Sequence, residues 1–138
     1  MAAKDLFHDA VRKSLLKEQW VITDDPLKIK IEGVKFEIDL AAERVFAAEK
    51  EGQKIAVEIK SFLNNSVLTD FHAALGQFLN YRLALQITES NRVLYLAVPF
   101  DTFDSFFQEV FVQQAVNLYQ LKLIVYDPNQ EVIIAWKD

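Results

Sequence analysis

Two charged residues, Glu58 and Lys60, flank Ile59 in a segment whose residue types suit phosphate chemistry. Residues 54–61 alternate between apolar and polar types, and this two-residue period predicts a strand. Residues two apart on a strand project from the same face, so the carboxylate and the ammonium group would lie side by side. The carboxylate can bind a hard divalent cation such as magnesium, and the lysine can orient a water molecule and balance charge on a phosphate.

A metal site of this kind needs a second carboxylate, and Asp39 is well placed to supply it. Residues 27–40 also alternate, and Asp39 lies near the end of the second half of that segment. A hairpin would bring this strand beside the strand of Glu58. We therefore expect Asp39 and Glu58 to hold magnesium, or manganese, and Lys60 to assist the attacking water.

The same residues also fit a plainer interpretation, a half-exposed strand with a solvated charged face. The chain has 20 acidic residues and 11 lysines, so about one or two acid-x-Lys triplets are expected by chance. The triplet alone is weak evidence for a site, so the choice between the two interpretations depends on the surrounding segments.

Gln77 and Tyr81 lie four residues apart in a segment, residues 66–85, that predicts a long helix with Ser66 as its cap. They share one face of that helix, where a packed tyrosine and an exposed amide would be unremarkable. However, the order of a helix, an acid-bearing strand, a Glu-x-Lys strand and a helix with Gln-x-x-x-Tyr resembles the PD-(D/E)xK nuclease superfamily. Ile38 stands where the motif has a proline, a position at which that superfamily often departs.

The superfamily resemblance implies a restriction-endonuclease-like αβββαβ core and magnesium-dependent phosphodiester hydrolysis. Asp39 would be the motif aspartate, Glu58 and Lys60 the (D/E)xK pair, and Gln77 with Tyr81 an accessory pair. Nuclease relatives often carry an extra acid on the first helix, which makes His8 and Asp9 possible accessory residues near the metal. For His8 the alternative is an ordinary surface or capping position.

A longer resemblance covers essentially the whole chain. It rests on three segments, KDLFHDAVRKSLLKEQW, IEGVKFEIDLAAERVFAAEKEGQKIAVEIKSF and LTDFHAALGQFLNYRLAL, which are similar to the XisH family. This family comprises excision-controlling factors of a cyanobacterial DNA element that is removed during heterocyst differentiation. The resemblance implies a small nuclease-like protein that controls DNA rearrangement, with a second small protein, XisI, as its partner. Since a separate recombinase cuts out the element, a non-catalytic accessory protein that binds a partner protein or DNA remains the alternative.

Length and composition predict one domain over residues 1–138, with 51% hydrophobic and 25% charged residues. The absence of cysteine excludes disulfides and thiolate-ligated metals, and two histidines are too few for a histidine-rich site. No apolar run is long enough to span a membrane, and the first residues lack a signal-peptide core, so we expect a cytoplasmic protein.

The net charge of −5 is unevenly distributed. Residues 1–69 hold 12 acidic and 11 basic residues, whereas residues 70–138 hold 8 and 4, so a DNA-binding surface should draw on the first half. Five phenylalanines between residues 100 and 111 predict core packing or an interface in a homo- or hetero-oligomer. His72 is expected to be structural. Four further basic residues are candidates for phosphate contacts or for plain solvation: Lys28, Lys30, Arg44 and Arg82.

Periodicity and turn residues predict an α/β (α+β) domain with a mixed central sheet flanked by helices and with extra C-terminal strands. Helices are expected at residues 4–19, 66–85 and 101–116, and strands at residues 27–40, about 44–49, 54–61, 92–98, 121–126 and 132–136. Turn residues are found at 24–26, 51–52 and 64–66, and the turn at 51–52 joins two of the early strands.

Overall fold

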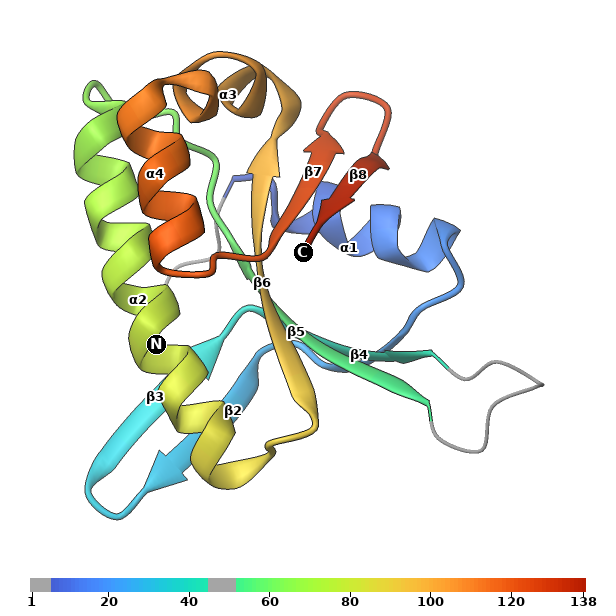
Figure 1. The fold of residues 1–138 in the computed structure, drawn as a ribbon. Helices are drawn as coiled ribbons and strands as arrows, with labels where there is room; N and C mark the ends of the chain where they lie inside the picture. Colours follow the sequence, from blue (N-terminus) through green and yellow to red (C-terminus); the bar gives the residue numbers. More distant parts are fainter. Residues whose placement is uncertain (1–5, 45–51) are drawn as a thin grey trace.

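A mixed sheet of six strands, in the order β1-β4-β5-β6-β7-β8, forms the centre of the molecule (Figure 1). This is a computed structural model, and it describes residues 6–44 and 52–138. Its strands are β1 (Val21–Asp24), β4 (Leu40–Arg44), β5 (Gln53–Ile59), β6 (Arg92–Pro99), β7 (Leu123–Asp127) and β8 (Val132–Lys137). The pairs β5–β6 and β6–β7 are parallel and the other three are antiparallel, which confirms the predicted mixed α/β fold.

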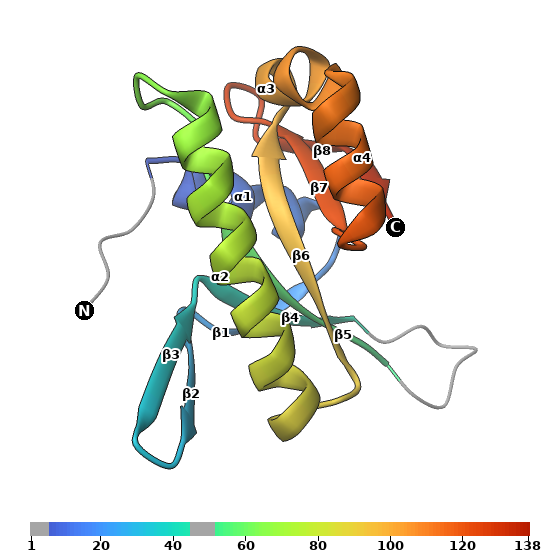
Figure 2. The same cartoon turned by 60° about the vertical axis from the view of Figure 1, so that its left-hand side comes forward.

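Helices cover both faces of this sheet, as Figures 1 and 2 show. They are α1 (His8–Lys17), α2 (Val67–Thr88), α3 (Phe100–Asp104) and α4 (Val110–Leu118), with a 3-10 turn, η1 (Phe106–Gln108), between the last two. Val11 and Leu15 of α1 pack on one face, and Phe71 and Phe78 of α2 pack on the other. None of the helices in the described part of the chain combines the length and apolar character needed to cross a membrane.

The alternation of β5 separates the two cores. Ile55, Val57 and Ile59 belong to the core under α1, and Ala56 belongs to the core under α2. Glu58 has the same parity as Ala56, so the predicted contrast between an apolar face and a face with the charged pair is confirmed.

The segment predicted as strands over residues 27–40 folds differently. Strands β2 (Leu27–Ile31) and β3 (Val34–Ile38) form a separate two-stranded sheet, and β4 rather than β3 pairs with β5. The hairpin leaves the main sheet because its apolar side, with Leu27 and Ile29, joins the core under α2. The strand expected at about residues 44–49 overlaps β4 only at Arg44, where β4 ends, and residues 45–49 lie outside the described residues.

Two further expectations are corrected. Strand β1 was not predicted, because its four residues alternate only between exposed and half-buried and carry no clear amphipathic pattern. The single helix expected at residues 101–116 is α3, η1 and α4, since the backbone at Glu109 is extended and Phe107 turns into the core. Without the inserted hairpin, the chain runs α1-β1-β4-β5-α2-β6, the predicted αβββαβ order, and β7 and β8 are the extra strands.

Candidate functional site

Asp39, Glu58 and Lys60 meet where β5 ends. Asp39 lies between β3 and β4, Glu58 is the penultimate residue of β5, and Lys60 follows that strand directly. The Ile59 amide donates to Oδ2 of Asp39 at 2.8 Å, and the Asp39 amide donates to Oε1 of Glu58 at 3.3 Å. Nζ of Lys60 lies 3.7 Å from Oε2 of Glu58. These reciprocal bonds fix both carboxyl groups beside the lysine.

The two carboxyl groups are held in a poorly hydrated place. Glu58 is only 5% exposed, and burial, followed by the nearby charge of Asp39, raises the pKa of Glu58 to about 8. Burial also raises the pKa of Asp39, although the Ile59 amide opposes that shift. Lys60 lowers the pKa of Glu58, but at 3.7 Å its attraction is smaller than the cost of burial. Without a cation, the site therefore favours a proton on this pair at neutral pH.

Tyr81 lies within electrostatic reach of this pair, and Gln77 lies one helical turn before it. Burial, then the charges of Glu58, Asp39 and Glu37, raise the pKa of Tyr81 to about 12. Gln77 is half-buried, and its Oε1 has no hydrogen-bond donor among the described residues. The structure thus places Tyr81 near the carboxylates, while no hydrogen bond joins Gln77 to Lys60 in the described part of the chain.

The first helix supplies one buried residue and one exposed residue. His8 is buried, not at the surface, and its Nε2 lies 2.7 Å from Oδ1 of Asp25. Arg12 donates to Oδ2 of the same carboxylate at 2.7 Å. Asp9 is exposed. Sequence reasoning missed Asp25, because residues 24–26 indicated only a break between elements.

Other sequence candidates have ordinary surroundings. His72 is exposed, so the expectation of a structural role was wrong; it lies on the outer side of α2, while Phe71 beside it is buried. Arg82 donates to the carbonyls of Tyr119 and Gln120, and the Arg44 guanidinium lies 4.5 Å from the Trp20 ring centre. Both arginines are thereby engaged within the fold. Lys28 and Lys30 are exposed on β2.

The carboxylate pair can be tested for its fit to magnesium. Among residues 6–44 and 52–138, no group of three or more acidic or histidine side chains is arranged around a common metal position. Magnesium nevertheless often takes only one or two carboxylates and completes its shell with water and substrate oxygens. The raised pKa values of Asp39 and Glu58 indicate two carboxyl groups that need a positive charge to ionise together. Two carboxyl groups held together in this way can supply the one or two carboxylate ligands that magnesium takes from a protein.

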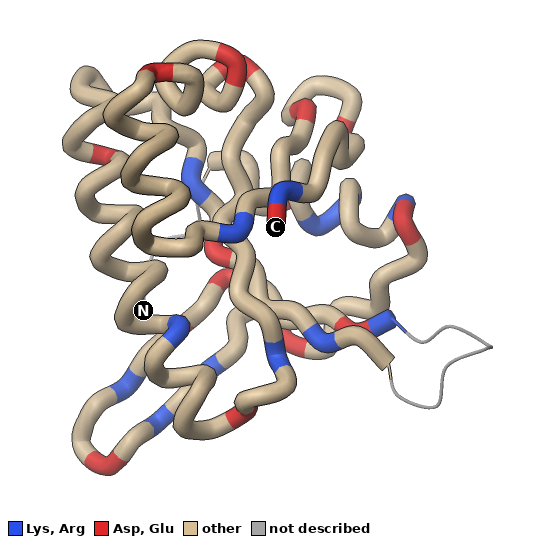
Figure 3. Tube along the Cα trace, viewed as in Figure 1, with Lys and Arg blue, Asp and Glu red and all other residues tan. Residues whose placement is uncertain are grey.

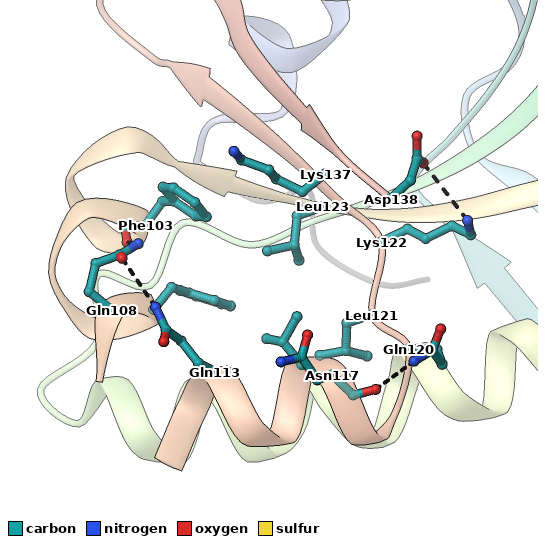
Figure 4. Close-up of a pocket in the computed structure, with 12 residues that line it drawn as sticks. Phe103, Gln108, Gln113, Asn117, Gln120, Leu121, Lys122, Leu123, Lys137 and Asp138 are labelled. Atoms are coloured by element: carbon teal, nitrogen blue, oxygen red, sulfur yellow. Dashed lines mark hydrogen bonds and ion pairs between the residues drawn. The ribbon is translucent and has the colours of Figure 1, made fainter. Parts of the chain in front are cut away.

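A separate cavity lies away from this pair. Figure 4 shows a cavity of about 340 Å³ between α4 and the strands β7 and β8. Phe103 lies at one end of it, and Lys137 and Asn117 face it from opposite walls; Phe107 also lines it. Its lining includes none of the carboxylates described above.

The sequence profile of the XisH protein family matches residues 1–134 of the chain. The chain belongs to the XisH family. An XisH family protein from Nostoc punctiforme has a crystal structure with 47% identity and a TM-score of 0.87, and the match covers 97% of this chain and 100% of that one. A crystal structure of an fdxN element excision controlling factor protein from Anabaena variabilis has 49% identity and a TM-score of 0.88, with coverages of 98% and 100%. No curated protein matches the chain.

Proposed function

We propose that this XisH protein controls the excision of a DNA element and that Asp39, Glu58 and Lys60 form a magnesium-dependent nuclease site of the PD-(D/E)xK type. The name of the Anabaena variabilis relative supports the first part. One observation carries the second: the buried Glu58 carboxyl group and the half-buried Asp39 carboxyl group are held together through the Ile59 and Asp39 amides, with the Lys60 ammonium group 3.7 Å from Glu58.

Each residue of the proposed site has a separate role. Asp39 and Glu58 would hold the ion, which activates water and offsets charge on the phosphate when it is bound. Lys60 is 24% exposed at its side chain, so its ammonium group can meet a solvent molecule or a phosphate oxygen while it stays beside Glu58. Tyr81 lies near both carboxylates and would orient Lys60 or the DNA backbone, with Gln77 one turn away.

A cleavage assay tests this proposal. Supercoiled, linear and branched DNA are incubated with the protein and magnesium or manganese. Glu58→Gln removes one carboxylate but keeps the size of the side chain, so we expect cleavage to fall at least about a hundredfold. Glu32→Gln changes an exposed glutamate in the hairpin turn and should leave cleavage unchanged. Equal cleavage by wild type and Glu58→Gln would contradict the proposed site.

A second function, a non-catalytic accessory factor, has its own support. The chain carries a net charge of −5, and the described residues offer no third acidic or histidine ligand beside the pair. In this case the protein would bind DNA or a protein partner, such as a small XisI-type protein, and promote the action of a recombinase. Unchanged DNA in every arm of the cleavage assay, with DNA or partner binding that Glu58→Gln does not affect, would favour this second function.

A further inference from the structure

The imidazole ring of His8 is held by a hydrogen bond at one of its two nitrogens. It is 3% exposed, and Asp25 contacts its Nε2 at 2.7 Å while Arg12 holds the other oxygen of that carboxylate. An ionised carboxylate can only accept hydrogen bonds, so the hydrogen of this contact is on Nε2. The imidazole therefore has one nitrogen engaged within the fold, and the other is left for a different partner.

Two contacts and one shared cavity place the residue before His8 near the end of β5 that carries the candidate site. Phe7, the residue before His8, packs edge-on against Tyr126, whose hydroxyl donates to the Lys60 carbonyl at 3.4 Å. Phe7 and Ser61 also line one cavity of about 180 Å³.

Asp25, the partner of His8, also lies near the candidate site. Asp24 pairs with Ala41 in the antiparallel β1–β4 ladder, so Asp25 lies beside the segment that carries Asp39. In addition, His8 lowers the pKa of Asp39.

Nδ1 of His8 is buried and has no hydrogen-bond partner among the described residues. Buried polar atoms of native proteins are nearly always paired, so this unpaired nitrogen is a candidate contact for a ligand. In the imidazolium form both ring nitrogens donate. Nδ1–H can then meet an anionic oxygen while Nε2–H stays on Asp25, and a phosphate favours that form because opposite charges attract.

We propose that His8 is a phosphate-binding residue of the Asp39–Glu58–Lys60 site. Nδ1 donates to a phosphate oxygen of the ligand, a proton from solvent completes the imidazolium, and Asp25 with Arg12 holds the ring in place. The inference rests on the proposed function for the identity of its ligand, a nucleotide phosphate. Phosphate binding itself requires neither cleavage nor magnesium, so it can be measured separately.

The chain has two histidines, which gives a direct spectroscopic test. Nitrogen-15 imidazole spectra of the full chain are recorded during titration with thymidine monophosphate and, in a second arm, with a short single-stranded oligothymidylate. We expect the Nδ1 signal of His8 to move to the protonated position, while exposed His72 on α2 remains unchanged. A response in both arms identifies the phosphate of any nucleotide as the ligand, and one with oligothymidylate alone identifies a phosphate within a strand. No movement of His8 in either arm, or equal movement of His72, overturns the proposal.

Two substitutions of His8 separate nucleotide binding through Nδ1 from the contact between Nε2 and Asp25. Glutamine places its amide near the Nε2 position and asparagine near the Nδ1 position. His8→Gln should keep the Asp25 contact yet weaken nucleotide binding about tenfold or more, since a hydrogen bond to a charged group is lost. His8→Asn should bind nearly as well as wild type. Wild-type affinity in His8→Gln overturns the inference, and the spectra decide if either variant does not fold. Cleavage with an unresponsive His8 would refute only this inference, whereas nucleotide binding without cleavage would refute only the nuclease proposal.

Discussion

At the scale of single residues, Glu58 links the stability of the protein to pH. The pKa of its carboxyl group is about 8 in the folded chain, against 4.5 as the ordinary value, because burial penalises the charged form. A raised folded-state pKa gives stability that is complete below the unfolded pKa and is lost as pH rises through the folded pKa. We therefore expect the free energy of unfolding to fall between about pH 4.5 and pH 8 by more than about 1.4 kcal/mol. Chemical denaturation at several pH values should show this fall in wild type and much less of it in Glu58→Gln.

Magnesium supplies a control for the same prediction. Ions bind the deprotonated carboxylates, so magnesium should raise the melting temperature more at pH 8.5 than at pH 6. Exposed Glu32, changed to glutamine, should leave both the pH profile and the magnesium effect as in wild type. A flat pH profile in wild type, with no effect of magnesium, would show that the carboxyl pair is an ordinary solvated feature.

Sequence reasoning predicted which residues of this candidate site lie together, but not all of the residues that surround them. The alternation of residues 54–61 was enough to place Glu58 and Lys60 on one face, and the need for a second carboxylate led to Asp39. The contacts of His8 could not be predicted from the sequence, because its partner Asp25 is 17 residues away and only tertiary packing brings the two together. A lone histidine near the start of a helix carries no sign of such a contact.

At the scale of elements, the phenylalanines of residues 100–111 divide between core and surface. Phe107 is 3% exposed and packs against the rings of Phe62, Phe71 and Phe106, whereas Phe111 is 68% exposed on α4. Phe107→Ala should therefore lower the free energy of unfolding by about 3–5 kcal/mol. Phe111→Ala should change it by less than about 0.5 kcal/mol in a monomer. Urea denaturation of both variants, at a protein concentration low enough to keep the chain monomeric, measures the difference, and similar losses would contradict this packing.

Composition predicted the apolar character of this segment but not its path. A continuous helix from residue 101 would have satisfied local helix propensity, and the extended backbone of Glu109 replaces it with three shorter elements. The cause lies in tertiary packing, since the Phe107 ring packs among four other aromatic rings. The hairpin of β2 and β3 shows the same limit: alternation identified the strands, and only the core under α2 decided which sheet they joined.

At the scale of the whole molecule, charge and apolar surface are separated. Figure 3 shows α4 without a charged residue, while lysines mark the hairpin of β2 and β3. Val110, Phe111 and Leu118 are exposed along α4. The outer edge of the sheet at β8 is less suited to association, because the register shift opposite Val125 and Tyr126 interrupts the strand. Of these two apolar surfaces, α4 is the better candidate for an interface.

A second copy of the chain is the occupant that we expect on α4. Two molecules of net charge −5 repel each other, and the repulsion is smallest where they meet through a helix without charges. Burial of exposed phenylalanine and leucine side chains would supply the attraction. Sedimentation should therefore give a dimer for wild type and a monomer for the pair of changes Phe111→Glu and Leu118→Glu, which set like charges against each other across a two-fold axis. Leu16→Glu on α1 adds the same charge at another exposed leucine and should leave the dimer intact. If the wild type is monomeric at high concentration, α4 does not pair with a second copy, and a different protein would be its partner. If Leu16→Glu dissociates the dimer equally, the added net charge and not the α4 contact explains the dissociation.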